Sequence, residues 1–118
     1  MENKNKKLPD KKDTEKFDIL YPMLTSIHNE MQDFAKKKQD GVLNELKVKL
    51  INNLLNDIKE ILKTEESSKY LNLLDNDTLP QNSDAVIIIG QYLSAMNVFH
   101  KKYHGWDSKV AENRWFTM

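Results

Sequence analysis

Apolar residues recur every three or four positions over most of this chain, which is the period of an amphipathic helix. The first such stretch predicts a helix over residues 15–38, with Pro22 near its first turn. Lys36, Lys37 and Lys38 would complement the helix dipole at its end. The expected core face consists of Phe17, Leu20, Leu24, Ile27, Met31 and Phe34.

A second apolar stripe follows the short connection Gln39-Asp40-Gly41, in which Gly41 suits the left-handed position after a helix end. This stripe predicts a helix over residues 42–63, and the short connection predicts an antiparallel helix hairpin. Its expected core residues are Leu43, Leu46, Leu50, Ile51, Leu54, Ile58, Ile61 and Leu62, and its expected solvated face carries Asn52, Asn56, Lys59 and Lys63.

The next stretch predicts a short helix from Ser67, its cap, to Asp75, burying Tyr70, Leu71 and Leu74. A loop over residues 76–82 follows, because it is rich in turn-forming residues and contains Pro80.

The most apolar stretch predicts a central helix over residues 83–104, capped by Asn82, Ser83 or Asp84. Its expected core face carries Ala85, Ile88, Ile89, Tyr92, Met96, Phe99 and Tyr103. A second, narrower stripe holds Ile87, Gln91, Ser94 and Val98, with Gly90 beside it. A solvated helix surface does not need these apolar and small residues, so the stripe indicates a contact surface.

Residues 105–118 contain both tryptophans and Phe116. One interpretation is a strap that folds back and packs Trp106, Trp115 and Phe116 on the helices. The other is a docking peptide, because Trp and Arg dominate interface hot spots.

These elements predict an all-α fold, a small helical bundle made of an antiparallel helix hairpin plus a central apolar C-terminal helix. Residues 1–13 are expected to form a disordered charged tail, since they can bury little apolar surface. Residues 14–104 would form the bundle, and residues 105–118 the aromatic strap.

Charge and composition exclude several function classes. The 118 residues carry no formal net charge and a single arginine, Arg114, which argues against sequence-specific DNA reading. Cysteine is absent, so disulfides, thiolate catalysis and Cys-based metal sites are excluded. The apolar run 85–99 is too short to span a bilayer and no secretory signal is present, so a cytoplasmic protein that does not bind membranes is expected.

Candidate chemistry is sparse. His100 and His104 have the i, i+4 spacing of helical zinc sites, but nothing places a third ligand from His28, Asp107 or Glu112 beside them. Hydrogen-bonded structural histidines are the favoured interpretation. No nucleotide-binding or nucleophile motif occurs, so neither an enzyme nor a bound metal or other cofactor is expected.

Two functional hypotheses remain. The favoured one is a non-enzymatic module that binds another protein, itself or both, by analogy with inhibitor, immunity or accessory-subunit proteins, and a homo-oligomer is expected. Its expected contact residues are Ile87, Gly90, Ser94, Val98, Trp106, Arg114, Trp115 and Phe116. The alternative is a nucleic-acid-binding subunit that uses Lys36, Lys37, Lys38, Lys101 and Lys102; it is disfavoured because acidic residues interleave with these lysines.

Overall fold

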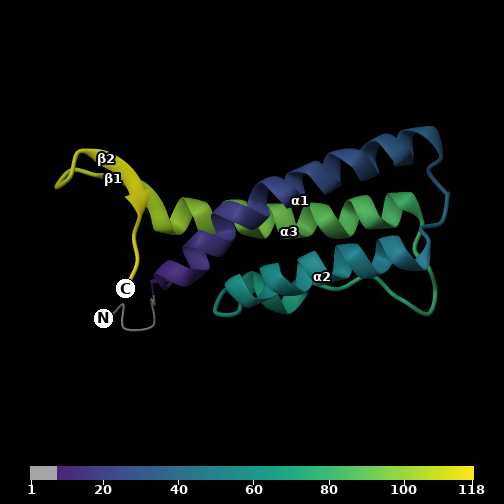
Figure 1. The fold of residues 1–118 in the computed structure, drawn as a ribbon, viewed down its shortest axis with the longest axis horizontal. Coiled ribbons are helices and arrows are strands. Elements are labelled where there is room, and N and C mark those ends of the chain that lie inside the picture. Colours follow the sequence, from purple (N-terminus) through teal and green to yellow (C-terminus); the bar gives the residue numbers. More distant parts are fainter. Residues whose placement is uncertain (1–7) are drawn as a thin grey trace.

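The computed structural model describes residues 8–118, with three helices along its length and a small two-stranded sheet at one end (Figure 1). The molecule measures 51 × 26 × 20 Å. The predicted helical class is confirmed, but the strands were not predicted. In order, the elements are α1 (Lys11–Lys37), α2 (Glu45–Ile61), the short 3-10 helix η2 (Glu66–Tyr70), α3 (Asn82–Tyr103), β1 (His104–Asp107) and β2 (Glu112–Trp115).

Helix α3 lies between α1 and α2 in the view of Figure 1, and α1 packs more extensively on α3 than on α2. After α2 and η2 the chain turns back, and residues 71–80, which we call the returning chain, run along α2 before α3 begins (Figure 1). Because of this return, α2 and α3 run in the same direction while α1 runs against both.

Helix α1 begins earlier than predicted, at Lys11, because the Asp10 carboxylate accepts a hydrogen bond from the Asp13 amide at 2.8 Å and caps the first turn. The end of the predicted tail is therefore helical, and residues 1–7 lie outside the described part. Pro22 falls inside α1 rather than in its first turn. Proline has no N–H to donate to the Asp18 carbonyl, and α1 changes direction along its first half in Figure 1.

The connection between α1 and α2 is fixed by the start of α3. The Asn82 amide donates to the Gly41 carbonyl at 2.7 Å, and the Leu43 amide donates to the Pro80 carbonyl at 2.9 Å. Gly41 does not take the predicted left-handed conformation. Glycine fits a close approach here instead, since a Cβ at this position would lie 2.9 Å from Asn82 Nδ2 and 3.2 Å from the Lys38 carbonyl oxygen.

The predicted core face of α2 is only partly correct. Leu46 and Leu50 are 63% and 56% exposed, whereas Val48 and Leu55 are completely buried. Phe34, the last predicted core residue of α1, is also exposed, and the Lys47 ammonium lies 4.5 Å from its ring centroid. Helix α2 is rotated about its own axis relative to the predicted core face, because it covers the returning chain as well as the other helices.

Asn52, which was predicted to be solvated, is buried and binds this returning chain. Its side-chain amide donates to the Leu74 carbonyl at 2.9 Å, and its carbonyl accepts from the Leu74 amide at 2.8 Å. The Lys59 ammonium donates to the Leu71 carbonyl at 3.1 Å. The predicted helix 67–75 is therefore not formed beyond Tyr70, where the chain is extended. Side chains of α2 hold this segment through hydrogen bonds to its backbone.

Burial confirms most of the predicted core face of α3: Ala85, Ile89, Tyr92, Met96, Phe99 and Tyr103 are buried, and Ile88 is half-buried. The helix begins at Asn82, one residue after its N-cap Gln81, so none of the three predicted caps is used. The Gln81 amide donates to the Asp84 carboxylate at 3.3 Å.

The C-terminal segment is an antiparallel hairpin in which His104 pairs with Trp115 and Asp107 with Glu112. The Asp107 carboxylate accepts from the Lys109 amide at 3.0 Å and pairs with Arg114 Nε at 2.9 Å. Asp107 thus holds both the turn and the second strand.

Candidate functional site

The exposed side of α3 carries the surface that its core does not explain. Ile87 and Val98 are 61% and 54% exposed, although they are apolar. They share one side of the helix with other exposed residues at spacings of three and four. We call this set the α3 face: Asp84, Ile87, Gln91, Ser94, Val98 and Lys101.

Open hollows adjoin the α3 face on both sides. One of about 310 Å³ lies between Tyr70 and Val98, and one of about 400 Å³ lies between Leu73 and Ile87. A third, of about 530 Å³, lies toward α1 beside Gln32. Tyr70 is 69% exposed and Leu73 is 38% exposed, so the returning chain adds apolar side chains to the edge of the α3 face.

The returning chain is held beside α3 at several points. Asn52 fixes Leu74, and the Tyr92 hydroxyl donates to the Asn72 carbonyl at 2.9 Å. Burial raises the pKa of Tyr92 to about 12, so this hydroxyl keeps its proton. Along this segment Leu71 and Leu74 are buried, whereas Tyr70 and Leu73 are exposed.

Tyr70 and Leu73 were missed because the predicted helix would have buried Tyr70. The sequence contained one usable signal, since a run of Leu-Asn-Leu-Leu-Asp lacks the strong capping and length of a stable helix.

Of the other residues predicted to bind a partner, Gly90 lies away from the exposed side. A Cβ at position 90 would lie 3.4 Å from Nε2 of His28 on α1. Gly90 therefore belongs to the packing between α1 and α3. Ser94 and the two apolar residues Ile87 and Val98 are the predicted positions that the structure brings together on one surface.

The C-terminal aromatic residues divide between packing and exposure. The Trp115 indole packs edge-on against Phe17 with ring centroids 5.0 Å apart, and its N–H donates to the Asp18 carboxylate at 3.2 Å. Phe116 is half-buried under the Arg114 guanidinium. Trp106 is 61% exposed at the tip of the sheet. Trp115 packs on the helices as the strap interpretation expects, whereas the Phe116 ring lies beside Arg114 of the sheet and Trp106 is exposed.

His100 and His104 stack on each other with ring centroids 4.4 Å apart, and both rings stand edge-on to Trp115. Burial lowers the pKa of His100 and the neighbouring His104 lowers it further, while Asp18 raises it. Among residues 8–118 no group of three or more His, Asp or Glu side chains is arranged to hold a metal ion. The histidines support the packing of Trp115.

Glu65 is buried at the end of α2, where it accepts hydrogen bonds from the Tyr103 hydroxyl and the Lys102 ammonium, both at 3.0 Å. The hydrogen bond to Glu65 is the main cause that raises the pKa of Lys102. Burial raises the pKa of Tyr103. The carboxylate is thus satisfied by two donors from α3 and ties the connection after α2 to the end of α3.

The lysines of the nucleic-acid hypothesis lie apart. Lys36, Lys37 and Lys38 end α1 beside the start of α3, where the Asn82 side chain donates to the Lys38 carbonyl, whereas Lys101 and Lys102 stand at the other end of α3. The two groups are separated by roughly 28 Å of helix. Lys102 is also paired with Glu65. The five lysines do not form one patch, and nucleic-acid binding stays a prediction.

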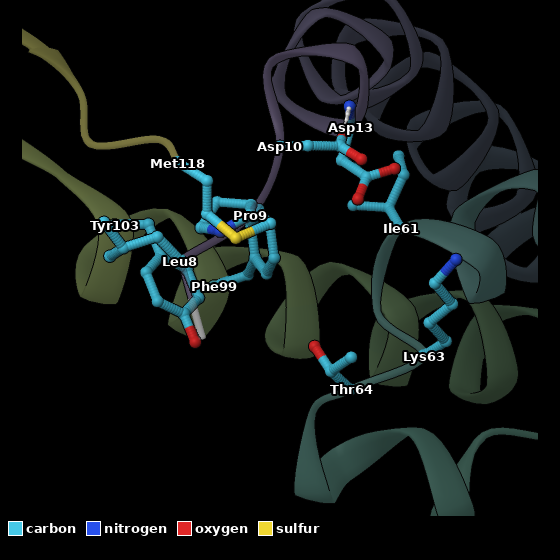
Figure 2. A pocket seen from close by; sticks show the side chains of 10 residues that line it. All are labelled: Leu8, Pro9, Asp10, Asp13, Ile61, Lys63, Thr64, Phe99, Tyr103 and Met118. Carbon is cyan, nitrogen blue, oxygen red and sulfur yellow. Dashed lines mark hydrogen bonds between the residues drawn. The ribbon is translucent and has the colours of Figure 1, made fainter. Parts of the chain in front are cut away.

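A small pocket lies where α1 begins and α3 ends (Figure 2). Leu8, Pro9 and Met118 gather beside Phe99 and Tyr103, and the Met118 amide donates to the Pro9 carbonyl at 3.1 Å. Asp13 lies on the polar side of the pocket, where burial raises its pKa and the Asp10 carboxylate raises it further. The pocket volume of about 170 Å³ is below the roughly 300 Å³ of small ligand sites. The α3 face is the larger candidate.

No family model, curated protein or solved structure was found that matches this chain. In the part of the chain from residue 8 onward, no helix has the length and apolar character needed to cross a bilayer.

Proposed function

We propose that this chain is a non-enzymatic protein-interaction module of the inhibitor, immunity or accessory-subunit type, and that it binds protein through the α3 face. The observation that supports the proposal is the exposure of Ile87 and Val98 on an otherwise well-packed helix, 61% and 54%. Exposed apolar side chains that form a continuous surface with an exposed aromatic residue are typical of interaction sites. Tyr70 and Leu73 continue the surface beyond the helix.

The fold supports this role because it makes the surface rigid. The predicted hairpin of α1 and α2 would serve as a scaffold that holds α3, while Asn52 and Tyr92 fix the returning chain on its other side. A preorganised surface loses little conformational entropy when a partner binds.

The test is affinity capture from native cells, with bound proteins identified by mass spectrometry and then rebound as purified components. We expect Ile87→Glu and Val98→Glu to abolish binding of the captured protein, because each places a charge in the apolar contact. Ile19→Glu is the matched control, since Ile19 is 63% exposed on α1. Equal capture by the control and both α3 variants would refute the proposal.

A further inference from the structure

We propose that the partner of the α3 face is a second copy of this chain, with the two α3 helices packed antiparallel about a twofold axis. This inference rests on the proposed function, because it takes the α3 face to be a protein-binding surface. It adds the identity of the partner and the geometry of the complex.

The first observation is the spacing of the α3 face. Its members are Asp84, Ile87, Gln91, Ser94, Val98 and Lys101, so the intervals alternate between three and four residues along the whole helix. Alternation of three and four is the pattern that lets two helices pack along a continuous seam. All six side chains are exposed, so the seam is open along α3.

The second observation is that the α3 face is complementary to itself when one copy is reversed. In antiparallel register, Asp84 lies opposite the partner's Lys101, and Ile87 lies opposite the partner's Val98. Gln91 lies opposite the partner's Ser94, and the twofold axis repeats each contact. An acid, an apolar side chain and a polar side chain thus each meet a matching group.

The parallel arrangement has the opposite electrostatics. It would place Asp84 beside the partner's Asp84 and Lys101 beside the partner's Lys101, so both ends would repel. Among residues 8–118 no carboxylate forms an ion pair with Lys101, so no described acid competes with the second copy for its ammonium.

The centre of the seam fixes the register. Gln91 and Ser94 would bury polar groups that need hydrogen-bond partners, and each can supply one to the other across the axis. A shift of one heptad in either direction would leave one of these two groups opposite an apolar residue and would separate the charged pairs. Polar residues in a helical seam have this effect on register in coiled coils.

Two other helices expose apolar pairs, but neither offers such a seam. Ile19 and Met23 flank Pro22, where α1 departs from a straight axis. Leu46 and Leu50 on α2 are followed on the same side by Asn53 and Asp57, without a cation to complete a reversed match. These pairs provide matched controls.

The first experiment measures association by sedimentation equilibrium at up to about 1 mM, where even a complex with a millimolar Kd is half formed. We expect the wild-type chain to reach twice the chain mass. Val98→Glu should weaken association by at least roughly 100-fold, because two charges enter the seam of each dimer. Leu50→Glu should leave association unchanged.

The charged pairs are tested by mixing. Lys101→Glu alone and Asp84→Lys alone should each weaken association by roughly 10- to 100-fold, since each creates two repulsive pairs. An equimolar mixture of the two variants should recover the dimer, because every pair between unlike copies is again opposite in sign. Lys49→Glu and Asp57→Lys serve as exposed controls outside the α3 face. Circular dichroism checks that Asp84→Lys, which removes a capping carboxylate, stays helical.

Orientation is tested by disulfide formation, because the native chain contains no cysteine. Copies with Ile87→Cys should oxidise with copies carrying Val98→Cys, whereas like copies place their thiols roughly 16 Å apart along the seam and should not. Cross-linking of like copies without cross-linking of the mixture would refute the antiparallel geometry. A wild-type chain that stays monomeric would overturn this inference but leave the proposed function intact, provided that another protein is captured through the α3 face.

Discussion

On the buried side of α3, Tyr92 and Met96 are completely inaccessible to solvent, whereas on the opposite side Ile87 and Val98 remain more than half exposed. The buried residues differ in size and interlock with α1, α2 and the returning chain. The exposed residues instead follow a regular spacing and end in opposite charges. One helix thus carries two patterns of residues, and packing within the chain explains only the first.

The largest expected difference between the two sides is in stability. Phe99→Ala should lower the free energy of unfolding by about 3–5 kcal/mol, because Phe99 is 1% exposed and packs on Phe17, Tyr103 and Trp115. Its neighbour Val98→Ala should change it by less than about 0.5 kcal/mol in the monomer. Urea unfolding at a concentration where the chain is monomeric measures both. Similar losses for the two variants would contradict the assignment of sides.

The next prediction concerns the returning chain that forms the edge of the α3 face. Asn52→Ala should cost about 2–4 kcal/mol, because it leaves the buried N–H and C=O of Leu74 without partners. Amide hydrogen exchange at Leu74 should accelerate in parallel. Asn53→Ala is the control and should cost less than about 0.5 kcal/mol, since Asn53 is exposed. Unchanged exchange at Leu74 would show that other contacts hold this segment.

Two adjacent lysines at the end of α3 lie on different sides of the helix, Lys101 on the α3 face and Lys102 beside Glu65. Lys102→Met should lower the free energy of unfolding by about 1 kcal/mol, a value reduced by the partial exposure of Lys102, because the buried Glu65 loses one of its two donors. It should leave self-association unchanged. Lys101→Met should do the reverse, with no loss of monomer stability and weaker association. The assignment of Lys101 and Lys102 to different sides of α3 would be contradicted if Lys101→Met lowered the stability of the monomer and Lys102→Met weakened association.

The smallest expected effect is on pH dependence. Because the pKa of His100 is lowered in the folded chain, the unfolded chain binds more protons below the ordinary value near 6.5, and stability falls as the pH falls through that value. Above it both states are neutral and the effect vanishes. The groups facing His100 are His104 and Asp18. The thermal midpoint between pH 7.5 and 5.5 should fall less in His100→Gln than in the wild type. An unchanged slope in His100→Gln would refute the assignment.

The sequence predicted the three long helices because their periodicity is local. It misplaced their first residues, and α2 begins only after the cap Asn44, whose side chain accepts from the Lys47 amide. It misplaced Leu46 and Leu50 because a wide apolar stripe fits more than one rotation of a helix. Their exposure follows from the chain that returns along α2. That contact joins Asn52 to Leu74 across 22 residues, and no local pattern signals it.

The C-terminal sheet likewise depends on contacts that no local sequence pattern signals. Its turn has no Asn-Gly or Asp-Gly pair to announce a hairpin, and its second strand is fixed by Asp107 pairing with Arg114 and by Trp115 reaching Asp18 of α1. The periodicity of the sequence was enough to predict which residues share a helix side, including Ile87, Gln91, Ser94 and Val98. The folded arrangement was needed to show which side is covered, that Gly90 faces α1 and that Tyr70 and Leu73 border the α3 face. The reason is that periodicity specifies directions around one helix, whereas burial depends on what the rest of the chain places opposite.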